Sequence, residues 1–109
     1  MYRVTVDQAV LDEIVRRLVE AVDPDRIILF RSRARGDPRP DSDVDLLIVK
    51  DSPEPPGRRG VHAYRALMEV TVPTDVLWYT PQEVRDWAGV RNHVVSRALR
   101  EGKVLYERH

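Results

Sequence analysis

Three short apolar runs of strand length most constrain the fold of this chain. They span residues 27–30, 44–49 and 75–79. Runs of this length, bounded by turn residues, are typical of buried strands. Because helix-length segments alternate with these runs, we expect an α+β fold in which one small mixed β-sheet carries helices packed mainly on one face. A length of 109 residues fits one domain, residues 1–109.

The segments before, between and after the apolar runs carry helical signals. In the segment before the first run, the apolar residues recur at helical spacing: Leu11, Ile14, Val15, Leu18 and Val22. In the segment after the third run, Thr80 and Glu83 have the spacing of a capping box, with Pro81 at the first helical position. Helices are expected at about 7–22, 58–70, 81–88 and 92–101, and a closing strand at 103–106. In the second helix, Val61, Tyr64, Leu67 and Met68 are predicted to form the apolar face.

The candidate chemistry lies where the second apolar run begins. Asp43 and Asp45 are two residues apart, so on a strand their carboxylates point to the same face. Burying two like charges without compensation is costly, so a cation is expected, and Mg²⁺ prefers such oxygen ligands. Asp75 opens the next strand and supplies a third carboxylate. Three acids can hold two metals about 3.5–4 Å apart, the geometry of nucleotidyl transfer.

The polar turn before these acids is a candidate phosphate site. Ser32 follows a buried strand, and a helical turn at this point would present free N–H groups to an anion. Arg33 and Arg35 add positive charge nearby. Gly36 permits backbone conformations that other residues resist, as the exit from such a turn requires.

Other interpretations of the acidic segment are weaker. Asp41, Asp43 and Asp45 match the first half of an EF-hand loop, but that loop requires glycine at its sixth position and glutamate at its twelfth. This chain has Leu46 and Ser52 there. A single Asp-x-Asp is often a solvated turn, so the interpretation rests on the combination with the serine and the third acid.

The remaining polar residues suggest no second site. His62, His93 and His109 lack metal-ligand spacing, so surface or core roles are expected. The Arg58-Arg59 pair is interpreted as a solvated helix start.

Composition limits the classes of function. Basic and acidic residues balance at 18 each, which argues against a dedicated nucleic-acid-binding protein. The chain has no cysteine, which excludes disulfides, thiolate metal sites and a cysteine nucleophile. No apolar run approaches the roughly 18 residues of a membrane span, and residues 1–7 lack a signal-peptide pattern. We therefore expect a cytoplasmic protein without a membrane partner.

The motif as a whole resembles a known family. Ser32, ten residues and Asp43-Val44-Asp45 are similar to the signature of the minimal nucleotidyltransferases of the DNA polymerase beta superfamily, which reads Gly-Ser, ten residues, Asp-x-Asp. The resemblance extends through residues 72–84 around Asp75 and covers roughly residues 8–105. It implies that Asp43, Asp45 and Asp75 are catalytic and bind two Mg²⁺ ions. It also implies that Ser32 contacts the triphosphate of ATP, and that AMP passes to an acceptor while pyrophosphate leaves.

The resemblance also implies a partner. Similar minimal nucleotidyltransferases are often encoded beside a HEPN-domain ribonuclease toxin, act as its antitoxin and can transfer AMP onto a toxin tyrosine. A homo- or hetero-oligomer is compatible with this role. Transfer to an aminoglycoside or to tRNA ranks lower, because so short a chain has little room for its own acceptor-binding domain.

One position departs from the family pattern. Arg31 stands where the family has the glycine that lets the backbone approach the triphosphate. Two outcomes are open. The guanidinium swings outward or binds phosphate and catalysis persists, or it blocks the pocket and leaves a binding module that neutralises its partner by contact alone.

Overall fold

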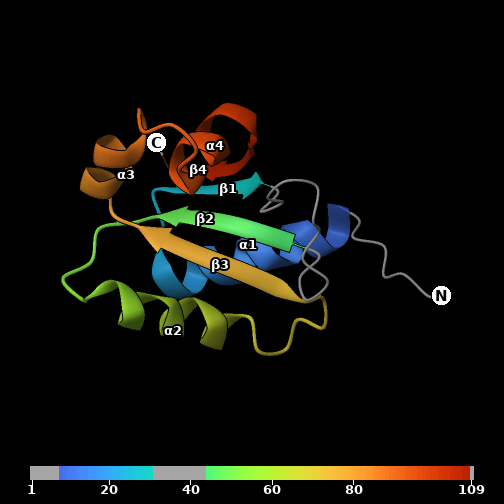
Figure 1. Ribbon diagram of the computed structural model, residues 1–109. Helices are drawn as coiled ribbons and strands as arrows, with labels where there is room; N and C mark the ends of the chain where they lie inside the picture. The colour runs from blue at the N-terminus through green and yellow to red at the C-terminus, as the bar shows by residue number, and fades with distance from the viewer. Residues whose placement is uncertain (1–7, 31–43, 109) are drawn as a thin grey trace.

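The computed structural model of the chain describes residues 8–30 and 44–108. These residues form four helices and one four-stranded sheet (Figure 1). The order confirms the prediction: α1 (Gln8–Val22), β1 (Arg26–Phe30), β2 (Val44–Val49), α2 (Pro56–Ala66), β3 (Thr74–Tyr79), α3 (Pro81–Trp87), α4 (Val94–Glu101) and β4 (Lys103–Glu107).

Two helices differ from their predicted limits. Helix α2 begins at Pro56 rather than near residue 58, because proline at the first helical position has its φ angle already set for a helix. It ends at Ala66 rather than residue 70, where Leu67 leaves the helical region with φ −102° and ψ 12°. Helix α4 begins at Val94 rather than residue 92, because Asn92 has a φ of 65° and cannot belong to a right-handed helix.

The sheet is mixed, as predicted. Its strand order is β3-β2-β1-β4, with β1 antiparallel to both β2 and β4 and with β2 parallel to β3. The parallel pair is possible because α2 provides the crossover between β2 and β3. Strand β3 therefore lies at one border of the sheet and β4 at the other.

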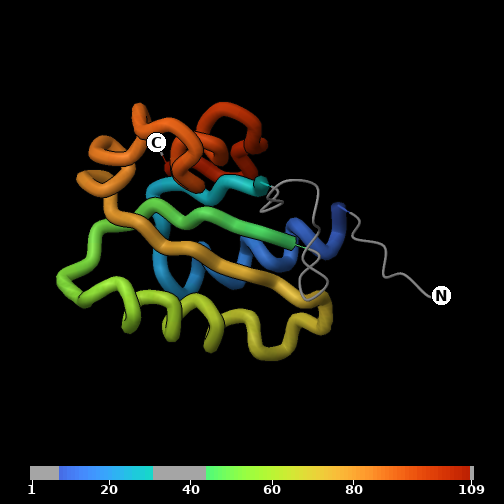
Figure 2. Tube along the Cα trace, viewed as in Figure 1, coloured from blue at the N-terminus to red at the C-terminus, as the bar shows by residue number. Residues whose placement is uncertain are grey.

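Helices cover both faces of the sheet (Figures 1 and 2). The two longer helices, α1 and α2, pack on one face, so most helical residues lie on one side of the sheet, as predicted. The short helices α3 and α4 cover part of the other. Successive residues of β1 and β2 point to opposite faces of the sheet, and nearly all of them are apolar. Both faces must therefore be covered by helices. The buried residues of the two cores are Ile14, Leu18, Ile27, Val44, Leu46, Ile48, Ala63, Leu67, Val72 and Val76 on the first face, and Ile28, Phe30, Leu47, Val49, Val84, Val95 and Ala98 on the second.

Helix α2 is fastened to β3 through a buried arginine. Arg59 donates hydrogen bonds to both carboxylate oxygens of Glu83, at 2.6 and 3.2 Å, and to the main-chain oxygens of Glu54 and Trp78, at 2.9 and 3.4 Å. Its side chain is only 7 % exposed. The interpretation of Arg58-Arg59 as a solvated helix start is therefore wrong for Arg59, whose charge is paired inside the protein, and it holds for the exposed Arg58.

Candidate active site

Two of the predicted acids lie side by side on neighbouring strands. Asp45 is the second residue of β2 and Asp75 the second residue of β3, and the two are direct partners in the parallel register. Adjacent strands are about 4.8 Å apart, and in-register residues of a parallel pair point to the same face. Both residues are half-buried. Two carboxylates are thus held close together where the strands begin.

A tyrosine from α2 meets this acid pair. The Tyr64 hydroxyl donates a hydrogen bond to Asp75 Oδ1 at 2.8 Å and accepts one from the Val76 N–H at 3.0 Å. Partial burial raises the pKa of Tyr64, and the negative charges of Asp75 and Asp45 act in the same direction. The hydrogen bonds of Tyr64 therefore place its hydroxyl beside the Asp75 carboxylate.

The other candidates lie outside the described residues. These are Asp43 of the metal set and the phosphate-binding candidates Arg31, Ser32, Arg33, Arg35 and Gly36. The residues that border this segment, Phe30 and Val44, are both at the acid pair: Phe30 is the antiparallel partner of Asp45, and Val44 precedes it. The topology therefore joins the ends of the predicted phosphate-binding segment to the end of the sheet that carries the acids.

The sequence matches a known protein family over most of its length. Residues 11–105 match the model of the nucleotidyltransferase domain family. The chain belongs to this family. No curated protein matched the sequence. The match spans most of the chain and includes every strand except the end of β4.

The acid pair of this nucleotidyltransferase domain fits a divalent cation. Carboxylate oxygens are the ligands that Mg²⁺ prefers, and two like charges this close gain from a shared cation. Within residues 8–30 and 44–108, no group of three or more histidine, cysteine or acidic residues converges to hold a metal. Asp45 and Asp75 are two of the three predicted ligands, and Asp43, the third, lies outside the described residues.

The histidines of the domain that the structure describes have structural contacts. His62 Nε2 lies 2.8 Å from Glu54 Oε1 at the surface. His93 Nδ1 accepts a hydrogen bond from the Val95 N–H and so caps α4, while its ring stacks on Trp87 with a centroid distance of 4.2 Å. These contacts agree with the expected surface and core roles of His62 and His93, and His109 lies outside the described residues.

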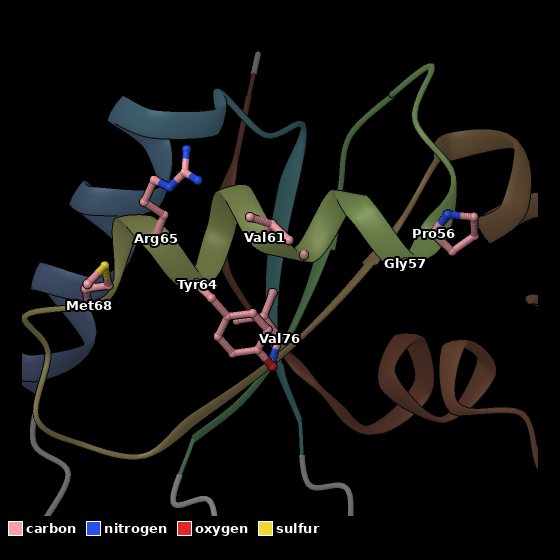
Figure 3. A pocket seen from close by; sticks show the side chains of 8 residues that line it. Pro56, Gly57, Val61, Tyr64, Arg65, Met68 and Val76 are labelled. Atoms are coloured by element: carbon pink, nitrogen blue, oxygen red, sulfur yellow. The ribbon is translucent and has the colours of Figure 1, made fainter.

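An apolar groove runs along α2, and Tyr64 and Val76 are among the residues that line it (Figure 3). It has a volume of about 560 Å³. Val61 and Met68 on its wall are 50 % and 78 % exposed. The predicted apolar face of α2 is thus wrong in part: Leu67 is buried, whereas Val61 and Met68 are exposed and Tyr64 is partly exposed while its hydroxyl reaches β3.

Sequence reasoning missed Tyr64 as a member of the site. Its helical position groups it with apolar neighbours, and no local motif marks a tyrosine that reaches a strand eleven residues further along the chain.

The described helices include none that is long and apolar enough to cross a membrane.

Proposed function

We propose that the domain is a Mg²⁺-dependent nucleotidyltransferase that transfers AMP from ATP to a protein hydroxyl, with a HEPN-domain toxin as its partner. The observation that carries the proposal is the in-register pairing of Asp45 with Asp75. The family match supports nucleotidyl transfer in general. The protein acceptor and the antitoxin role rest on the resemblance to minimal nucleotidyltransferases.

The residues divide the work in a simple way. Asp43, Asp45 and Asp75 hold the metal ions, which supply charge neutralisation at the triphosphate and orient the reacting groups. Ser32 binds the phosphates, with Arg33, Arg35 and the backbone at Gly36 completing the anion site. The acceptor oxygen forms a bond to the α-phosphorus, the bond from the α-phosphorus to the bridging oxygen breaks, and pyrophosphate leaves. The proton of the acceptor hydroxyl passes to a neighbouring carboxylate or to water.

The test uses radiolabelled ATP. The protein is incubated with ATP labelled at the α-phosphate, Mg²⁺ and a candidate HEPN-domain partner, and label on the HEPN protein is the expected result. Asp45→Asn and Asp75→Asn should each reduce labelling by about 100-fold or more, because they remove charge stabilisation from the transition state. Asp51→Asn is the matched control, since among the residues that the structure describes Asp51 accepts a hydrogen bond from the Ser52 N–H in its own turn.

The rival function is a binding module that neutralises its partner without catalysis. The exposed groove on α2 favours it, because solvent-exposed apolar patches often mark protein contacts. The same variants separate the two functions. Neutralisation of the toxin that survives both Asp45→Asn and Asp75→Asn supports the binding module, and neutralisation that disappears with labelling supports the enzyme.

A further inference from the structure

We propose that Tyr64 is a positioning residue that fixes the carboxylate of Asp75 for metal binding. The proposal rests on the proposed function, since it concerns the same acid pair. It assigns a role to a side chain that belongs to α2 rather than to either strand of the site.

The two hydrogen bonds of the hydroxyl determine its orientation. The Tyr64 oxygen accepts from the Val76 N–H at 3.0 Å, which leaves its own proton to point elsewhere. That proton is directed at Asp75 Oδ1, at 2.8 Å. Because Val76 directly follows Asp75, one hydroxyl ties the side chain of an acid to the backbone beside it. The carboxylate is thereby held in a fixed direction relative to β3.

The arrangement leaves one carboxylate oxygen for a cation. Among the described residues, Tyr64 binds the Asp75 carboxylate at Oδ1, which leaves Oδ2 for a cation. A hydrogen bond to one oxygen of a ligating carboxylate orients the other, and loss of such an outer partner typically lowers metal affinity by about 10- to 100-fold.

The position of Tyr64 depends in turn on how α2 is fastened. Arg59, on the same helix, bonds the Trp78 carbonyl further along β3, so α2 contacts this strand through polar groups at two points. Figure 3 shows the Tyr64 ring extending from α2 to Val76. Tyr64 is 44 % exposed, so removal of its hydroxyl leaves little buried packing to disturb.

The experiment compares Tyr64→Phe with Tyr79→Phe. Tyr79 lies on the same strand at the end away from the acids, so its variant makes the same chemical change without touching Asp75. Binding of Mn²⁺ alone is measured from the electron paramagnetic resonance signal of the free ion, well below the melting temperature of each protein. Tyr64→Phe should weaken Mn²⁺ binding about tenfold, and Tyr79→Phe should bind like the parent.

Kinetics and structure provide independent readouts. With saturating Mg²⁺, Tyr64→Phe should regain most of the parent kcat, because excess metal compensates for lower metal affinity. A crystal structure of the variant should show the Asp75 carboxylate rotated or in more than one orientation. A purely structural role would lower the melting temperature without changing either readout.

Two outcomes overturn the proposal. If the parent binds Mn²⁺ and transfers AMP while Tyr64→Phe binds the metal equally or more tightly, Tyr64 does not position Asp75, and the proposed function stands. If the parent neither binds Mn²⁺ nor labels any acceptor, the proposed function fails and the role of Tyr64 fails with it.

Discussion

The ion pair between Arg59 and Glu83 should dominate the stability of the region that supports the site. The Arg59 side chain is 7 % exposed and that of Glu83 is 28 % exposed. Glu83 also completes the capping box of α3, where its carboxylate accepts from the Thr80 N–H at 2.9 Å. Replacement of Glu83 by glutamine isolates the charge, because glutamine serves as well as glutamate at this position of a capping box.

The magnitude follows from the burial of Arg59. In Glu83→Gln the guanidinium keeps its bonds to the main-chain oxygens of Glu54 and Trp78 but loses its counter-charge. Breaking a buried pair from one side costs about 3–5 kcal/mol, and we expect about 3 kcal/mol because Glu83 is partly solvated. At about 4–8 °C for each kcal/mol in a small domain, the melting temperature should fall by at least about 12 °C. Thr80→Ala, which removes the cap and keeps the pair, should cost only about 1 kcal/mol.

The dependence on pH provides a second signature. The hydrogen bond from Arg59 holds the pKa of Glu83 below its ordinary value of 4.5. Because the pKa of Glu83 is lower in the folded than in the unfolded protein, its ionised carboxylate stabilises the fold. This stabilisation is complete at pH values above the unfolded-state pKa, and it is lost as the pH falls through the folded-state pKa. The difference in unfolding free energy between the parent and Glu83→Gln should therefore be largest at pH 7 and shrink toward pH 3.

Urea denaturation of four proteins provides the assay: the parent, Glu83→Gln, Arg59→Met and the double variant. The double variant should be more stable than the sum of the two single losses predicts, because methionine leaves no unpaired buried charge. A loss below about 1 kcal/mol in Glu83→Gln at pH 7, or a loss that is the same at pH 3, would refute the reasoning.

Three further changes have defined outcomes. Gly102→Ala should destabilise the domain by about 1–3 kcal/mol, since a Cβ there would lie 2.6 Å from a side-chain carbon of β1 and 2.9 Å from a backbone oxygen of that strand. Gly89→Ala, whose Cβ would meet no atom within 4 Å, is its control in the same melting experiment. His93→Ala should cost about 1 kcal/mol by urea denaturation, through loss of the α4 cap and of the stack on Trp87. Arg31→Gly should tighten ATP binding measured by calorimetry, because glycine lets the backbone approach the phosphates, and an unchanged affinity would contradict this.

Local patterns were sufficient to predict the elements and the central pair of acids. The capping box of Thr80 and Glu83 is present as predicted, and α4 ends before Gly102 as the sequence indicates. Asp45 and Asp75 could be placed on neighbouring strands because a helical crossover usually joins adjacent parallel strands. Each of these inferences needs only the residues within one element or two consecutive ones.

The features that escaped prediction depend on how α2 is rotated against the sheet. Arg59 and Tyr64 are five residues apart on this helix, and both turn toward β3. Periodicity identifies an apolar face but not which polar side chains will reach a neighbouring strand, since packing of the whole helix decides that. The charged residue Arg59 is therefore buried, whereas the aromatic residue Tyr64 is partly exposed, the reverse of what the residue types suggest.

The bonds between α2 and β3 also determine how the sheet can meet another chain. Strand β3 is a border strand, yet its Val76 N–H and Trp78 carbonyl already bond Tyr64 and Arg59. An incoming strand would have to displace both side chains, so β3 is protected against edge-to-edge association. A protein that approaches from this side would therefore meet side chains of α2 before it could pair with the main chain of β3.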